Sequence, residues 1–286
     1  MSRAHYFVIL VLLLLSGVAT AADPAAGGSE LLINAYRNFT ASSGYHMTTD
    51  SLMTVPVGKE LPGQSTFLVR TQTSSDVQAS PWRLRSITTV RLEYGSGVKQ
   101  KVLQQYGEER EGVFSVYSKL DNGWERQAVS LANFRYDPLT EYERYFRAIR
   151  SVRVLQESEA SVNYQVVVDS AYLRDIVDHV LAAAADRVGR LPESVYADID
   201  EFTYTVEIDK RTMLIAKMEM DASPLLASIG ARLAAAQEIP ENQRLMLRDL
   251  LASMQLRITV IFSQRDASDP IVIPAEALQA AAIQAE

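Results

Sequence analysis

The chain of 286 residues contains no cysteine and carries a formal net charge of −7 at pH 7. The lack of cysteine excludes disulfide bonds, thiolate nucleophiles, Cys-ligated zinc and iron–sulfur clusters. The mild acidic balance argues against nucleic acid as a partner, and the length allows a domain to bury a large core without cross-links.

The N-terminal segment has the pattern of a secretory signal peptide. Arg3 supplies a short basic region, an unbroken apolar run covers residues 6–15, and residues 19–21 (Ala-Thr-Ala) form a typical cleavage site. We therefore expect residues 1–21 to be removed on export and the mature protein to be periplasmic or secreted; an uncleaved N-terminal anchor is the alternative. The apolar run is too short to span a bilayer core of roughly 30 Å. Without a lipobox cysteine, no stable membrane anchor is expected.

The first half of the mature chain is rich in expected strands. After a flexible lead-in over residues 22–29, apolar residues at helical spacing predict a helix over residues 30–44. Alternating runs with turn signals between them then predict strands over residues 45–55, 65–72, 84–94, 98–106 and 112–120. The short connections between these runs favour a meander of antiparallel neighbours over parallel crossovers.

The second half mixes helices with strands. The pattern predicts helices over residues 139–151, 170–189, 223–237 and 240–254, and strands over residues 152–157, 161–169 and 254–266. A proline-bounded extended stretch and a short Ala-rich tail over residues 276–286 follow.

The order of elements indicates a single α+β domain over residues 30–275. We expect an open, coiled antiparallel sheet, a half-barrel, with helices packed across its concave face. No linker rich in Pro, Gly or Ser divides the mature chain, although a subdivision near residue 150 would separate strand-rich from helix-rich sequence.

One hairpin, residues 202–221, alternates apolar and polar residues on both sides of a turn at residues 209–212. This period of two is typical of a half-buried antiparallel strand pair. The first apolar row contains Phe202, Tyr204, Val206 and Ile208, and the second contains Leu214, Ala216, Met218 and Met220. These rows cover either the protein's own core or a hydrophobic ligand.

The sequence offers little support for catalysis. His46 and His179 are isolated, without the spacing of a metal site, and the Gly95-Ser96-Gly97 run is too short for a nucleophile elbow. Several carboxylates could in principle act as a catalytic pair, but their positions are typical of solvated turns and strand edges; they are Glu108, Glu109, Glu111, Asp198, Asp200 and Glu201. We therefore expect no enzyme, no cofactor and no metal site.

The late hairpin, with Ile208-Asp209 before a Lys210-Arg211-Thr212 turn, resembles that of the LolA/LolB-like lipoprotein-carrier superfamily, which includes the LppX/LprG-type lipid-binding envelope proteins. The stretch around Asn122-Gly123-Trp124 is similar to the strand–turn–Trp segment of that group. The resemblance implies an open β-barrel with a helical lid over an apolar cavity that shields acyl chains in the cell envelope.

We accordingly expect an exported binding protein for a hydrophobic small molecule, a lipid or the acyl chain of a lipoprotein. The concentration of methionine around the hairpin favours a deformable apolar surface. The residues expected to line the pocket are Phe202, Tyr204, Val206, Met218, Met220, Leu225 and Leu226. The alternative is an interaction or sensor module that has a filled core and recognises a protein partner of the envelope.

Overall fold

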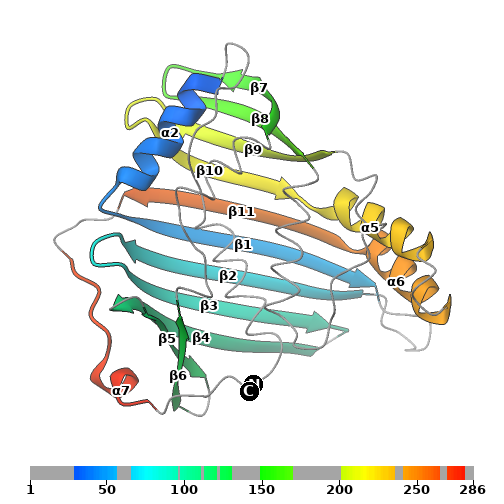
Figure 1. Cartoon of the computed structure of the whole chain (residues 1–286). Helices are drawn as coiled ribbons and strands as arrows, with labels where there is room; N and C mark the ends of the chain where they lie inside the picture. The colour runs from blue at the N-terminus through cyan, green and yellow to red at the C-terminus, as the bar shows by residue number, and fades with distance from the viewer. Residues whose placement is uncertain are drawn as a thin grey trace.

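The computed structural model describes residues 29–56, 66–95, 97–110, 113–120, 123–130, 149–169, 201–235, 241–264 and 269–280 (Figure 1). Four features expected from the sequence lie outside these residues: the signal peptide at 1–21, nearly all of the lead-in at 22–29, the helix at 170–189 and most of the helix at 139–151.

An eleven-stranded antiparallel sheet forms the body of the described structure (Figure 1). Its strands run in the order β6-β5-β4-β3-β2-β1-β11-β10-β9-β8-β7. They are β1 (Gly44–Pro56), β2 (Thr66–Gln78), β3 (Arg83–Tyr94), β4 (Gly97–Arg110), β5 (Val113–Leu120), β6 (Gly123–Ser130), β7 (Ile149–Glu157), β8 (Ser161–Asp169), β9 (Glu201–Asp209), β10 (Leu214–Asp221) and β11 (Gln255–Gln264). Because β6 and β7 are the two edges, the sheet is open, and this part of the predicted fold class is confirmed.

The last strand joins two meanders. Strands β1 to β6 follow one another in space as in sequence, and so do β7 to β10. β11 pairs with β1 on one side, where Phe262 lies opposite Met47, and with β10 on the other, where Val260 lies opposite Met218. The C-terminal strand therefore connects the N-terminal half of the sheet to the hairpin of β9 and β10.

Within the described ranges, four helices accompany the sheet: α2 (Ser29–Ala41), α5 (Ser223–Ala235), α6 (Glu241–Ser253) and α7 (Ala275–Leu278). In Figure 1, α2 lies over the half of the sheet that contains β8 to β10, whereas α5 and α6 form a pair at the ends of the strands, and α7 lies near β5 and β6. The apolar stripe of α2 consists of Leu32, Ala35, Tyr36 and Phe39, at the spacing that places residues on one side of a helix.

The main core lies between α2 and one face of the sheet. We call this face, which carries Met47, Val206 and Val260, the inner face. Its central side chains are almost completely inaccessible to solvent: Met47 and Val260 are 1 % exposed and Val206 is 0 % exposed. Residues from α2, β1 and β8 to β11 all contribute to this core cluster, so the helix and five strands are held together by one apolar contact surface.

A second, smaller core lies on the opposite, outer face. Tyr106 of β4 and Tyr117 of β5 pack there against Ile271, Ile273 and Ala277 of the C-terminal segment. The segment is also held by hydrogen bonds, because Arg83 Nη1 donates to the carbonyl oxygen of Ile271 at 2.8 Å. Ala277, at the start of the expected tail, is completely buried, so the described part of the C-terminal segment belongs to the packed fold.

Three details of the expected elements were wrong or missing. The helix predicted over residues 139–151 does not extend to its end, because Ile149 already begins β7. Strand β6 was not predicted, although the turn before Trp124 was. The second apolar row of the hairpin is interrupted: the register shifts between Ile215 and Lys217, so Ile215 lies opposite Ile208 and replaces Ala216 in the buried row.

A charged row on the outer face links the first three strands. His46, Asp76 and Arg85 lie opposite one another on β1, β2 and β3. Asp76 Oδ2 accepts a hydrogen bond from Arg85 Nη2 at 2.7 Å, and Asp76 Oδ1 lies 2.9 Å from His46 Nδ1. Burial of Asp76 opposes ionisation, but the hydrogen bonds to His46 and Arg85 prevail and lower the pKa of this carboxyl.

Replacing Asp76 by asparagine is expected to destabilise the protein by about 2 kcal/mol at pH 7, because the hydrogen bonds to a charged acceptor are lost. A carboxyl with a lowered folded-state pKa stabilises the fold above its unfolded-state pKa of about 3.9, and this contribution disappears as the pH falls through the folded-state value. Urea unfolding from pH 7 to pH 3 should therefore show the difference between Asp76→Asn and wild type shrinking at low pH. Asp249→Asn, at an exposed carboxylate of α6, should have little effect.

Candidate functional site

The structure brings five of the seven expected pocket residues together on the inner face. Met218 lies opposite Val206, and Met220 lies opposite Tyr204, in the pairing of β10 with β9. Tyr204 and Val206 are core residues, and Phe202, Met218 and Met220 are half-buried and pack against the same core cluster.

The centre of this group is filled by α2. Tyr36 is 0 % exposed, and its phenol group interacts with that of Tyr204, which is 5 % exposed. Burial raises the pKa of both phenols, and both remain neutral at physiological pH. Around Tyr204 and Val206, the apolar side of the hairpin therefore packs against the protein's own core.

Leu225 and Leu226 lie elsewhere. Both belong to the first turns of α5 and are half-buried, but neither is part of the inner-face core cluster. The start of α5 is fixed to the beginning of β11, since Ala222 N donates to Leu256 O at 2.8 Å and Leu256 N donates to Ser223 Oγ at 3.0 Å. The structure thus separates these two leucines from the other five predicted residues.

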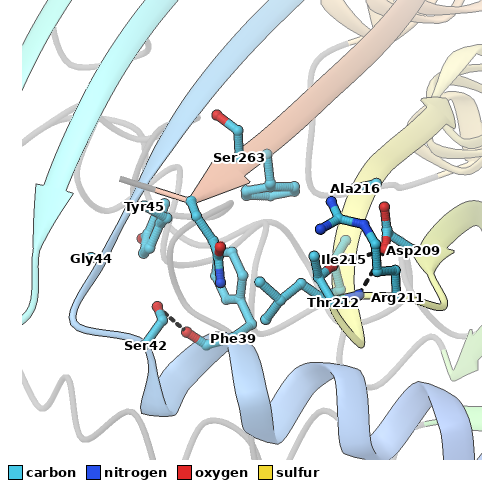
Figure 2. A pocket seen from close by; sticks show the side chains of 13 residues that line it. Phe39, Ser42, Gly44, Tyr45, Asp209, Arg211, Thr212, Ile215, Ala216 and Ser263 are labelled. Atoms are coloured by element: carbon cyan, nitrogen blue, oxygen red, sulfur yellow. Dashed lines mark hydrogen bonds between the residues drawn. The ribbon is translucent and has the colours of Figure 1, made fainter. Parts of the chain in front are cut away.

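A pocket of about 210 Å³ opens at the C-terminal end of α2 (Figure 2). It forms where the end of α2, the start of β1, the end of β11 and the turn between β9 and β10 meet. Its lining residues are Phe39, Ser42, Gly44, Tyr45, Asp209, Arg211, Thr212, Leu214, Ile215, Ala216, Phe262, Ser263 and Gln264.

An aromatic cluster forms the apolar part of this pocket. The ring centroid of Phe39 lies 4.5 Å from that of Tyr45 and 5.0 Å from that of Phe262. Phe39 and Phe262 are also members of the inner-face core, as is Ile215, and all three are less than 10 % exposed. The apolar core under α2 is therefore continuous with the wall of the pocket.

The polar part of the pocket comes from the turn between β9 and β10. Asp209 Oδ1 accepts from the backbone nitrogen of Thr212 at 2.8 Å and from its hydroxyl at 3.1 Å. The backbone hydrogen bond from Thr212 is the largest influence on Asp209 and lowers its pKa, so the carboxylate is ionised at neutral pH. Met213 closes the turn at a φ of 55°, in the left-handed region that few methionines occupy.

Neighbouring elements hold this turn in place from two sides. Asn38 Nδ2 of α2 donates to Met213 O at 3.1 Å. On the other side, Lys210 N donates to Ala160 O at 2.9 Å, and Lys210 Nζ lies 2.7 Å from Glu157 Oε1. The turn consequently presents its remaining cation, Arg211, from a fixed backbone.

The same inner face becomes polar beyond β1. Thr73 and Thr88 are hydrogen-bonded through their hydroxyls at 3.0 Å, and so are Ser75 and Ser86. All four are buried, and Gln105 of β4 extends this polar strip at 1 % exposure. The inner face is therefore apolar over β8 to β11 and lined with hydroxyl groups over β2 and β3.

Two of the catalytic candidates that lie within the described residues are held by structural contacts. His46 is paired with Asp76, and Glu108 accepts a hydrogen bond from the Tyr117 hydroxyl at 2.9 Å. Three of the carboxylates, Glu111, Asp198 and Asp200, lie outside the described residues, as does His179. Within the described ranges no three His, Asp or Glu side chains are grouped so that they could hold a metal ion.

Sequence reasoning missed most of the pocket. Arg211 stood out only as part of a charged turn, and nothing in the sequence placed Phe39, Tyr45 and Phe262 together. Among the helices of the described chain, none has the length and apolar character needed to cross a bilayer. No protein-family model matches this chain, and no curated protein shows significant sequence similarity to it.

Proposed function

We propose that this protein is an exported binding protein that shields part of a hydrophobic ligand, such as a lipid or the acyl chain of a lipoprotein. The observation that carries the proposal is the continuity between the apolar core beneath α2 and the open pocket beside it. An acyl chain entering this pocket would contact Phe39, Phe262 and Ile215. Its buried length would be removed from water, which stabilises the complex by about 25 cal/mol per Å² of apolar area buried.

The form of the pocket supports a partial enclosure of the ligand. Its volume of about 210 Å³ lies below the roughly 300–1,000 Å³ typical of pockets for drug-sized molecules. The pocket therefore fits one end of a chain better than a complete lipid. In this proposal α2 and further helices lie across the concave side of the coiled sheet, and the ligand enters at the edge of that cover rather than beneath its centre.

The half-barrel module with a filled core is the alternative, and one observation favours it. Tyr36 packs against Tyr204, and the two residues are only 0 % and 5 % exposed in the described structure. If the pocket is a surface depression without a ligand, the same sheet would serve as a scaffold for recognising a protein partner of the cell envelope.

A matched pair of tryptophan substitutions on β11 tests the proposal. Gln264 lines the pocket at one end of this strand, and Gln255 is exposed at the other end. Binding of the neutral apolar dye Nile red should be saturable in wild type and weakened by about tenfold, or about 1.4 kcal/mol, in Gln264→Trp, because the indole occupies the pocket. Gln255→Trp should bind as wild type does.

Native mass spectrometry of the exported protein, followed by organic extraction, supplies the independent measurement. A co-purifying acylated molecule at fixed stoichiometry would support the proposal and identify the ligand class. Equal dye binding by both tryptophan variants, together with a protein mass that remains free of lipid after incubation with envelope lipids, would overturn it in favour of the interaction module.

A further inference from the structure

We propose that the pocket binds a single-chain amphiphile with an anionic head, and that Arg211 is the contact for that head. This inference rests on the proposed function and specifies the chemistry of its ligand. It starts from the unequal roles of two adjacent cations, Lys210 and Arg211, in the turn between β9 and β10.

Lys210 is occupied by the protein itself. Its Nζ lies 2.7 Å from Glu157 Oε1 and 2.7 Å from the carbonyl oxygen of Ser158, and both partners belong to the end of β7 and the turn after it. Arg211 is exposed, lines the pocket and forms no ion pair within 4 Å among the described residues. Figure 2 shows its guanidinium group directed toward the pocket. The turn therefore uses one cation for structure and leaves the other for an incoming group.

The neighbouring carboxylate of Asp209 does not form an ion pair with Arg211 that would replace a ligand's anionic head. Asp209 attracts Arg211 electrostatically, but its Oδ1 atom already accepts two hydrogen bonds from Thr212. A guanidinium group has five N–H donors in a planar fork that matches a carboxylate or phosphate group in a bidentate arrangement. Arg211 thus keeps donors for a second anion while Asp209 fixes the turn.

The backbone that carries Arg211 is preorganised. Thr212 is tied to Asp209, and Met213 is held both by the carbonyl oxygen of Asp209 at 2.8 Å and by Asn38 of α2 at 3.1 Å. A head group binding here would not have to order a flexible loop, and this lowers the entropic cost of association.

The aromatic side chains of the pocket indicate that the part of the ligand beyond its head is an apolar chain. Phe39, Tyr45 and Phe262 lie within 6.3 Å of one another by ring centroids and line the same pocket as the turn. A chain attached to a head at Arg211 would pack against these rings. The volume of about 210 Å³ leaves space for part of one chain and not for the several chains of a multiply acylated lipid.

Calorimetric titration at pH 8 with twelve-carbon amphiphiles tests this inference on the full chain. Wild type should bind dodecanoate and dodecyl phosphate more tightly than neutral dodecanol by about tenfold or more, because a charge-assisted hydrogen bond forms only with the anions. Arg211→Gln should reduce the affinity for the two anions to that for dodecanol and leave dodecanol binding unchanged. Dodecyltrimethylammonium should bind no better than dodecanol.

Arg257→Gln is the matched control, because Arg257 is an exposed arginine at the opposite end of β11 from the pocket. This variant should retain the preference of wild type for anions. Equal binding of dodecanoate and dodecanol, unchanged by Arg211→Gln, would overturn the anionic head and leave the apolar pocket standing. No binding of any of these compounds would overturn both proposals. The relative affinities of dodecanoate and dodecyl phosphate would show which anionic head the site prefers.

Discussion

Replacing Tyr36 by alanine is expected to lower the free energy of unfolding by about 4 kcal/mol, the range found for removing a large aromatic side chain from a core. Tyr36 is 0 % exposed and lies at the centre of the cluster that joins α2 to β8, β9 and β10. The substitution leaves a cavity and also removes the partner of the Tyr204 phenol. Urea unfolding followed by circular dichroism should show a lower midpoint with a similar dependence on denaturant.

Tyr36→Phe separates the two contributions. This variant keeps the ring, loses only the hydroxyl and should cost about 1–2 kcal/mol. If Tyr36→Ala unfolds at the same urea concentration as wild type, α2 is a detachable cover and not part of the core. In that case the surface around Val206 would become available to a ligand, and the site would extend beneath the helix.

Because Val206 is buried, a charged substitution at this position cannot distinguish the two candidate functions. A charged residue at this position would have to be placed in a core that is 0 % exposed, at a cost of several kcal/mol. Such a variant would fail to fold whether the protein binds lipid or another protein. Substitutions at the pocket mouth, such as Gln264→Trp and Arg211→Gln, change the site while leaving this core intact.

Local sequence patterns predicted the elements well where a strand or helix has one buried side. The alternation in β8 places Val162, Tyr164, Val166 and Val168 on the inner face, and all four are buried. The helical spacing of α2 predicted a helix over residues 30–44, and the structure has it over Ser29–Ala41. These patterns are set by which side of an element faces the core, so they are visible in a short stretch of chain.

The pocket could not be predicted in the same way, because it depends on pairings between distant segments. Tyr45 lies opposite Gln264 only because the last strand inserts between β1 and β10. The shift in register at Ala216 places Ile215 in the buried row and is not visible in the alternation of the hairpin. Apolar alternation thus identified the inner face but not where that face opens to solvent.

Packing on the outer face likewise could not be predicted from local sequence patterns. Ile271 and Ile273 lie in the proline-bounded extended stretch that precedes the short Ala-rich tail, and this pattern does not indicate what the stretch packs against. In the structure they are 1 % and 8 % exposed, because Tyr106 and Tyr117 provide an apolar surface on the outer side of β4 and β5. An extended segment has no periodicity that indicates its partner, so only the tertiary arrangement identifies this contact.

Gly44→Ala is expected to lower the free energy of unfolding by about 3 kcal/mol, as overpacking at a rigid contact does. A Cβ atom at this position would lie 2.5 Å from the carbonyl oxygen of Val77, which belongs to the backbone of β2 and cannot swing away. The close approach is fixed by the adjacent hydrogen bond from Ala79 N to Ser43 O at 2.9 Å. Because Gly44 also lines the pocket, the shift of β1 away from β2 should weaken Nile red binding as well.

Gly97→Ala provides the matched comparison, since Gly97 also begins a strand of the same sheet. Its Cβ would lie 3.1 Å from ring atoms of Tyr94, a side chain that can move, so urea unfolding should show a change of less than about 1 kcal/mol. Equal stability of the two alanine variants would mean that β1 and β2 separate without cost at the pocket. A destabilised Gly44→Ala protein that still binds Nile red as wild type does would place the dye away from this end of α2, and would therefore count against the pocket as the ligand site.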